Sequence, residues 1–191
     1  MSQTAISFTV LGTPRPQGSK RGIVRGGKAV LVEQVKGLHS WRQDAAHAAL
    51  EARQAAGVTM PTPAPVCVVA HFLFTRPKGH FTRPKDLYSH ELRRSAPIYP
   101  GRGCGDIDKL LRALCDAITG VLFDDDSQVA HVTASREYAK RGQPPQAQVT
   151  VAEVECAVQS CGHSVGAIVS SDDGTHYCFA CACGGAKETP K

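Results

Sequence analysis

Two groups of aspartates flank one short apolar pattern in this chain of 191 residues. The first group is Asp106 and Asp108, and the second is Asp124, Asp125 and Asp126. Carboxylate oxygens suit hard divalent cations, and Mg²⁺ typically takes one or two carboxylates while it keeps several waters. If the fold brings the two groups together, the repulsion between their charges requires a cation to offset it. The pattern therefore favours a magnesium site, and a bound Mg²⁺ can activate water.

An amphipathic helix is expected between the two acidic groups. Its apolar residues recur three to four apart, as Leu110, Leu111, Leu114, Ala117 and Ile118. Gly120 follows as a residue that tolerates the left-handed conformation of a helix end. On such a helix Asp108, Arg112 and Asp116 share one face. Without a metal, these three residues would be an ordinary surface ladder of ion pairs, and the second acidic group a solvated turn.

Further strands and a second helix must position this unit. Strands are expected around residues 6–10, 66–74, 128–138 and 146–155. One further short strand is expected between the first strand and a helix at 38–56, which has Trp41 in the core. The 66–74 segment is apolar on both faces, as in a central strand, and His71 within it is expected to be packed. This order predicts an α/β or α+β domain with a small mixed sheet and two main helices, spanning residues 1–155.

Two segments, 12–28 and 75–105, are rich in cations and are expected to be loops without regular structure. The cations that we single out are Arg15, Lys20, Arg21, Arg25, Arg76, Lys78, Arg83 and Lys85. In the second segment Phe81, Tyr88 and Tyr99 are interleaved with the cations. Cations contact phosphates and rings stack on unpaired bases, whereas the alternative is a pair of solvated basic loops. We interpret both segments as nucleic-acid contacts that do not read sequence.

Composition limits the remaining possibilities. The chain is 42% hydrophobic and 20% charged with a net charge of +5, which is typical of a globular protein with an acidic partner. No stretch approaches the ~20 apolar residues of a membrane span. The first ten residues do not resemble a secretory signal, so we expect a cytoplasmic protein. We expect neither a membrane nor a small-molecule cofactor among its partners. The eight cysteines then suggest free thiols or metal ligands.

The run Gly105–Val129, GDIDKLLRALCDAITGVLFDDDSQV, resembles the signature of the RusA family of Holliday junction resolvases, which phages and prophages commonly carry. The family pattern is Asp-x-Asp-Asn-Leu-x-Lys, an Asp-Ala-Leu helix end and then Asp-Asp-x-Gln-Val. The segment from Gly12 to Lys20 is similar to the family's N-terminal Pro-x-Pro-x-Gly-basic loop. The resemblance runs from about residue 5 to residue 155 and implies the RusA fold.

Carried over position by position, the resemblance implies metal ligation by Asp106, Asp108 and Asp126, with Asp125 as the neighbouring member of the pair and Asp116 as the helix-end aspartate. Two positions depart from the pattern, because the family's Asn is Lys109 and its essential Lys is Arg112. Arginine keeps the charge but does not give up a proton. Either Arg112 is a fixed phosphate clamp, or Lys109 supplies the catalytic ammonium.

The resemblance implies a Mg²⁺-dependent endodeoxyribonuclease of DNA recombination and repair. The enzyme would be a homodimer that resolves four-way junctions by symmetric nicks. One alternative is a non-catalytic junction-binding module whose acidic site has degenerated, as the departures at Lys109 and Arg112 allow. Another takes the Asp-x-Asp at Asp106 as the metal motif of a nucleotide-sugar transferase. The second acidic group discriminates between these readings, since only the nuclease requires it.

Residues 156–191 form a separate tail that the resemblance does not cover. The candidate zinc ligands are two pairs, Cys161 with His163 and Cys178 with Cys181. Asp173-Gly174 between the pairs is a strong hairpin signal, and a hairpin that joins two such pairs is the basis of a small zinc ribbon. Cys156 could replace His163, and Cys183 is a spare. A unit of about 30 residues rarely has enough core without a metal, so we predict a structural Zn²⁺.

Purified protein is expected to carry about one tightly bound zinc ion per chain. Chelation should remove the ion, unfold the tail hairpin and expose reactive thiols, because the thiolate ligands are held by the metal. Elemental analysis with thiol titration measures both effects. Zinc-free protein from a preparation with added zinc and no chelator would contradict the assignment. A Cys181→Ser variant that keeps its zinc would instead identify Cys183 as the ligand.

Overall fold

The structure is a computed structural model that describes residues 5–18, 20–33, 35–83, 85, 91–154, 168–170 and 176–178. The chain divides into two compact units, Met1–Glu153 and Val154–Lys191, which are considered separately. Among the described residues, no helix combines the length and apolar character needed to cross a membrane.

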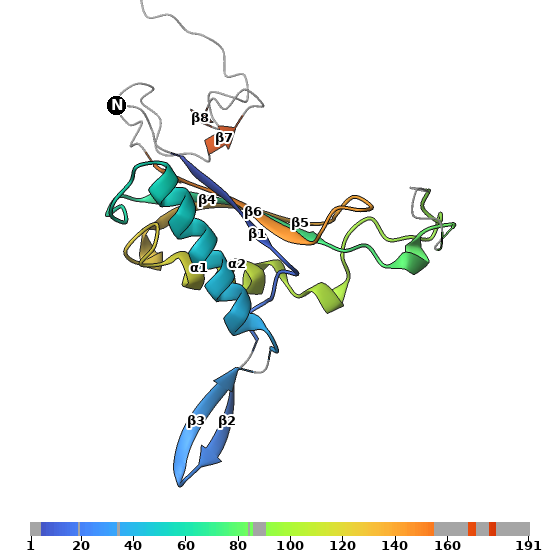
Figure 1. Ribbon diagram of the computed structural model, residues 1–191, viewed down its shortest axis with the longest axis horizontal. Helices are drawn as coiled ribbons and strands as arrows, with labels where there is room; N and C mark the ends of the chain where they lie inside the picture. The colour runs from blue at the N-terminus through green and yellow to red at the C-terminus, as the bar shows by residue number, and fades with distance from the viewer. Residues whose placement is uncertain are drawn as a thin grey trace, which may run out of the picture. The chain divides into compact units, whose positions relative to one another are not determined.

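The first unit contains a four-stranded sheet, a separate hairpin and two main helices (Figure 1). Its elements are β1 (Ile6–Leu11), β2 (Lys20–Arg25), β3 (Lys28–Glu33), α1 (Leu38–Ala55), β4 (Val66–Phe74), α2 (Ile107–Ile118), β5 (Val129–Tyr138) and β6 (Gln146–Glu153). Single 3-10 turns occur at η1 (Lys78–His80), η2 (Arg102–Cys104) and η3 (Asp126–Gln128). The sheet order is β1-β6-β4-β5, in which only β4 and β5 run parallel. This arrangement confirms the predicted α+β class with a small mixed sheet.

The core lies between one face of the sheet and the two helices (Figure 1). Strand β4 alternates strictly, and its inward residues Val66, Val68, Ala70, Phe72 and Phe74 are buried. Helix α1 contributes Leu38, Trp41, Ala45 and Ala49 at helical spacing, so that its alanines allow close approach to β1 and α2. The expectation that Trp41 is a core residue is confirmed, since only 3% of it is exposed.

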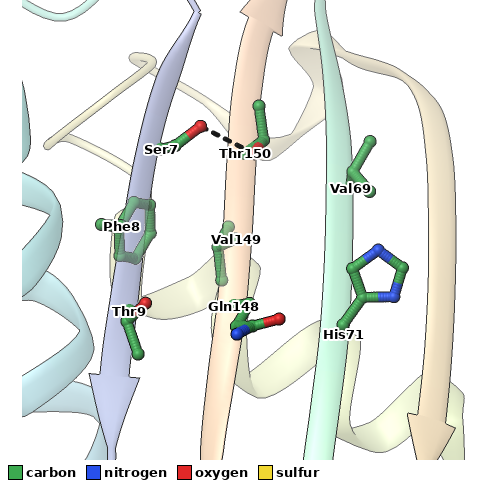
Figure 2. A pocket seen from close by; sticks show the side chains of 8 residues that line it. All are labelled: Ser7, Phe8, Thr9, Val69, His71, Gln148, Val149 and Thr150. Carbon is green, nitrogen blue, oxygen red and sulfur yellow. Dashed lines mark hydrogen bonds between the residues drawn. The ribbon is translucent and has the colours of Figure 1, made fainter. Parts of the chain in front are cut away.

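The other face of the sheet is polar and carries a shallow pocket of about 340 Å³ (Figure 2). On this face the Ser7 and Thr150 hydroxyls are 2.8 Å apart, and His71 Nδ1 lies 2.8 Å from Ser135 Oγ. The prediction that His71 is packed is therefore wrong, because the apolar run of β4 hides a period-two alternation that turns His71 outward.

The first basic segment is a loop, as predicted, only up to residue 18, because β2 and the start of β3 follow. Strands β2 and β3 pair antiparallel, with Arg25 opposite Lys28 at the turn. Gly26 and Gly27 form this turn at φ of 58° and 74°, as a two-residue hairpin turn requires. The Gly-Gly pair between branched apolar residues was the signal for a hairpin. The described residues of the second basic segment are irregular as predicted, apart from η1, η2 and a bridge between Phe81 and Leu92.

Beyond Val154, the second unit is described at two short strands, β7 (Ile168–Ser170) and β8 (His176–Cys178), which pair antiparallel. The Asp173-Gly174 turn and the candidate ligands Cys161, His163 and Cys181 lie outside the described residues, as does the side chain of Cys178. The zinc ribbon therefore stays a prediction.

Replacing Leu114 by alanine should lower the free energy of unfolding by ~2–5 kcal/mol, because its fully buried side chain would leave a cavity under α2. The matched control is Leu111→Ala on the same helix, where the side chain is only partly buried and the loss should be clearly smaller. Urea denaturation measures both variants. Equal losses would contradict the orientation of α2 that is described here.

Candidate active site

Helix α2 presents an acidic face because its apolar stripe is buried. Leu110, Ala113, Leu114, Ala117 and Ile118 all point into the core. Asp108 and Arg112 lie on the exposed side of the same helix, one turn apart. Burial of the stripe thus fixes the face on which the charged residues are displayed. The helix ends at Ile118, and Gly120 follows at a φ of 75°, as the sequence predicts.

Asp106 is the residue before the first turn of α2, but its side chain does not cap the helix. Its Oδ2 instead accepts a hydrogen bond from Lys109 Nζ at 2.7 Å, in an exposed ion pair. This hydrogen bond, with the charges of Lys109, Arg136 and Arg102, lowers the pKa of Asp106 below its usual value. The carboxylate is therefore ionised at neutral pH, with Lys109 as its cationic partner.

Three contacts hold the start of α2 in place. Gly105 adopts a φ of 81°, and a Cβ at this position would lie 2.5 Å from Pro16 Cγ. The backbone N–H of Gln17 donates to the Lys109 carbonyl at 2.9 Å. A guanidinium N–H of Arg136, on β5, donates to the Gly105 carbonyl. The N-terminal loop and the sheet thereby converge on the residue before Asp106.

The second acidic group is organised by a capping box. The N–H of Ser127 donates to Asp125 Oδ1 at 2.9 Å, and the Asp125 N–H donates to Gln128 Oε1 at 2.8 Å. Gln128 Nε2 also donates to the carbonyls of Thr62 and Ala64, each at 2.9 Å. The bonds from Ser127 lower the pKa of Asp125. The glutamine of the motif therefore anchors the turn, and one oxygen of Asp125 is used to shape it.

Asp126 occupies the first turn of η3 with its side chain exposed. Burial, and then the nearby charges of Asp116 and Asp126, raise the pKa of the Cys115 thiol to about 11. Asp126 therefore lies within electrostatic reach of the second half of α2. Asp116 does not continue an ion-pair ladder along α2, because its Oδ2 accepts from Arg42 Nη2 of α1 at 2.7 Å. That pair ties the two helices together, and sequence spacing alone could not reveal it.

The donor chemistry fits Mg²⁺, although the described side chains do not converge on one point. Within the described parts of the chain, no three His, Cys, Asp or Glu residues are close enough to hold an ion. Asp106 and Asp108 lie at the start of α2, whereas Asp126 lies towards its other end. Mg²⁺ needs only one or two carboxylates when waters and substrate phosphates complete its shell. The exposed carboxylates along this face meet that requirement.

The predicted nucleic-acid contacts are distributed over several loops. Arg15, Lys78, Arg83 and Lys85 are exposed, and the side chains of Lys20, Arg21 and Arg25 lie outside the described residues. Arg76 is partly buried against Tyr138. Sequence reasoning missed the roles of Arg136, which donates to the Gly105 carbonyl, and of Tyr138, which packs against Arg76. These partners are distant in sequence, so that only the fold reveals them.

Residues 8–152 match the family model described as Endodeoxyribonuclease RusA, which covers most of the chain. The chain is also 28% identical over 149 residues to the uncharacterized protein YqaN of Bacillus subtilis (strain 168). That alignment covers 78% of this chain and 96% of the relative.

Replacing Gly105 by alanine should destabilise the protein by more than ~1 kcal/mol, because a side chain is strained at this positive φ and would overlap Pro16. Gly103→Ala is the matched control two residues away, where a Cβ would meet no atom within 4 Å. Thermal unfolding compares the two variants. If Gly105→Ala is as stable as Gly103→Ala, the result would contradict the close packing of Pro16 against Gly105.

Proposed function

Because the chain belongs to the RusA endodeoxyribonuclease family, we propose that it is a Mg²⁺-dependent nuclease that resolves four-way DNA junctions by paired symmetric nicks. The observation that carries the proposal is the acidic face of α2, with Asp106, Asp108 and Arg112 exposed at the start of a helix that is otherwise packed into the core. The basic residues Arg102 and Arg136 lie close enough to lower the pKa of Asp106. Carboxylates for a metal and cations for phosphate thus occur side by side.

Asp106, Asp108 and Asp126 would hold the Mg²⁺, and Asp125 would contribute through the oxygen that Ser127 does not use. Bound there, the ion supplies Lewis-acid polarisation of the scissile phosphate and a water of lowered pKa. The protein's own part is to keep these carboxylates ionised and to orient the phosphate. The lowered pKa values of Asp106 and Asp125 serve the first task.

Arg112 and Lys109 have separate tasks in this proposal. Arg112 forms no ion pair within the described residues, and its planar guanidinium suits a two-pronged contact with phosphate. Lys109 neutralises Asp106 in the absence of metal. If a metal ion replaced Lys109 as the partner of Asp106, the freed Lys109 ammonium would be able to offset charge that develops on the phosphate. Lys109 is also the residue that could supply a proton, since arginine does not release one.

The proposal also covers oligomeric state and domain organisation. Symmetric nicks on opposing strands require two sites, so we propose that the enzyme acts as a homodimer on branched DNA. Residues 1–155 would form the nuclease domain. Residues 156–191 would form a tail stabilised by Zn²⁺ on Cys161, His163, Cys178 and Cys181.

A second candidate function is binding of junctions without cleavage. The observation that favours it is the 2.7 Å bond between Lys109 and Asp106, in which an ammonium occupies a carboxylate that a metal would need. In that case the acidic site would be degenerate, and Mg²⁺ would not support cutting. Junction binding would then be salt-dependent but metal-independent.

The purified protein is expected to nick four-way junctions in Mg²⁺ and to leave a matched linear duplex largely intact. Asp106→Asn, Asp108→Asn and Asp126→Asn should each abolish nicking, because a metal-holding charge is lost. Their affinity for junctions should hold or rise, since a negative charge that faces phosphate has been removed. Denaturing gels measure nicking, and gel shifts in EDTA measure affinity.

Asp124→Asn is the control, because Asp124 is exposed beside the matched pair and should be close to neutral. An essential Asp124 with a dispensable Asp126 would show that the register of the second acidic group is wrong. Junction binding without any nicking in Mg²⁺ or Mn²⁺ would favour the binding module.

A further inference from the structure

A cavity of about 390 Å³ opens where β4 and β5 end, away from the acidic residues of α2. Its walls include the cations Arg76, Lys140 and Arg141 and the rings of Phe81 and Tyr138. Cavities that bind small molecules measure ~300–1,000 Å³, so this one has room for a single nucleotide but not for a double helix. No carboxylate lines it among the described residues.

Each ring in the cavity is paired with a guanidinium. Arg76 Cζ lies 4.2 Å from the centre of the Tyr138 ring, and Arg141 Cζ lies 4.2 Å from the centre of the Phe81 ring. His80 packs edge-on against Tyr138 at 5.5 Å and helps to fix its ring. A guanidinium stacked on a ring leaves its edge for phosphate oxygens and its outer plane for a base.

Arg76 is held in place before any ligand arrives. Its Nη1 donates to the Pro97 carbonyl at 2.9 Å, and its Nη2 is 3.4 Å from the Ile98 carbonyl. These described bonds use two of the five N–H donors that a guanidinium carries. An arginine that is already ordered loses little side-chain entropy when it meets a phosphate.

The cavity is connected to the acidic face through β5. Arg136, which donates to the carbonyl before Asp106, and Tyr138 lie two residues apart and therefore on the same side of the strand. Strand β5 therefore carries one residue that contacts the start of α2 and one that lines the cavity.

We propose that this cavity is a subsite for one unpaired nucleotide of a DNA strand. The phosphate of this nucleotide is contacted by Arg76, Lys140 and Arg141. Its base stacks on the rings and guanidinium planes that line the cavity. The proposal rests on the proposed function, since it assumes that DNA is the substrate. It adds that the protein holds a nucleotide that has left its base pair, as occurs at a branch point or in a single strand.

The test uses the full-length protein in EDTA and a single-stranded oligonucleotide of about eight nucleotides with one 2-aminopurine, whose fluorescence falls when the base stacks. The wild-type protein should bind and quench the probe. Tyr138→Leu should weaken binding by ~10-fold and remove most of the quenching, because a stacking ring is lost while apolar bulk is kept. Arg141→Gln should reduce the slope of log affinity against log salt by ~0.7, as expected for one lost phosphate contact on a single strand.

The matched control is Arg94→Gln, which removes an exposed arginine of the same basic segment that does not line the cavity. It should leave the quenching unchanged. The proposal would be overturned if the wild-type protein did not quench the probe. It would also be overturned if the variants of Tyr138 and Arg141 melted like the wild type and quenched the probe equally. Junction nicking by the wild type is measured in parallel. If the wild type nicks junctions but the variants quench the probe normally, the subsite alone is rejected. If the variants lose quenching but the wild type does not nick junctions, the nuclease function alone is rejected.

Discussion

Burial of one side of α2 is the constraint on which the site depends. Five side chains of this 12-residue helix are buried in the core. Rotation of the helix would expose Leu110 and Leu114 and would bury charged residues instead, each at a cost of several kcal/mol. The hydrophobic core therefore sets the direction in which Asp108 and Arg112 point, without any direct contact to them. A surface site can be ordered in this way by a rigid element that lies beneath it.

The two ends of the acidic face are fixed by polar contacts that the core cannot supply. At the start of α2, the carbonyl of Gly105 accepts from Arg136 and the carbonyl of Lys109 accepts from the Gln17 N–H. At the other end, Gln128 closes a capping box and binds the carbonyl of Thr62. Apart from the local capping box, each of these bonds joins segments that are distant in sequence. The carboxylates remain exposed, and those of Asp106 and Asp125 are also restrained by their bonds to Lys109 and Ser127.

Much of this unit follows from sequence, because hydrophobic periodicity reports burial directly. The bounds of β4 agree with the pattern, and those of α1, β5 and β6 agree within two residues. The alternation within β4 was obscured, because residues between its buried positions are themselves mostly apolar. The β2–β3 hairpin was not predicted, because cations interrupt the apolar residues on both sides of the Gly26-Gly27 turn.

The charged contacts were less predictable than the elements. Helical spacing placed Asp108, Arg112 and Asp116 on one face, but Asp116 is paired with Arg42 across the helix interface. A position in the sequence does not reveal such partners, because they depend on how two elements pack. The same holds for Tyr138 and Arg141, whose partners come from a different loop. The role of Lys109 depends on a bond to Asp106 that spacing allowed but did not require.

The central claim is that the acidic groups that flank α2 bind divalent metal together with a DNA phosphate. Amide NMR spectra with substoichiometric Mn²⁺ test this claim most directly. They are recorded for the wild type and for an Asp108→Asn variant, each with and without a four-way junction. Paramagnetic broadening in the wild type should centre on residues 106–112 and 125–128 and should strengthen when the junction is added. It should be much weaker in the variant. Broadening that is confined to one acidic group, or that ignores both the junction and the substitution, would contradict the account.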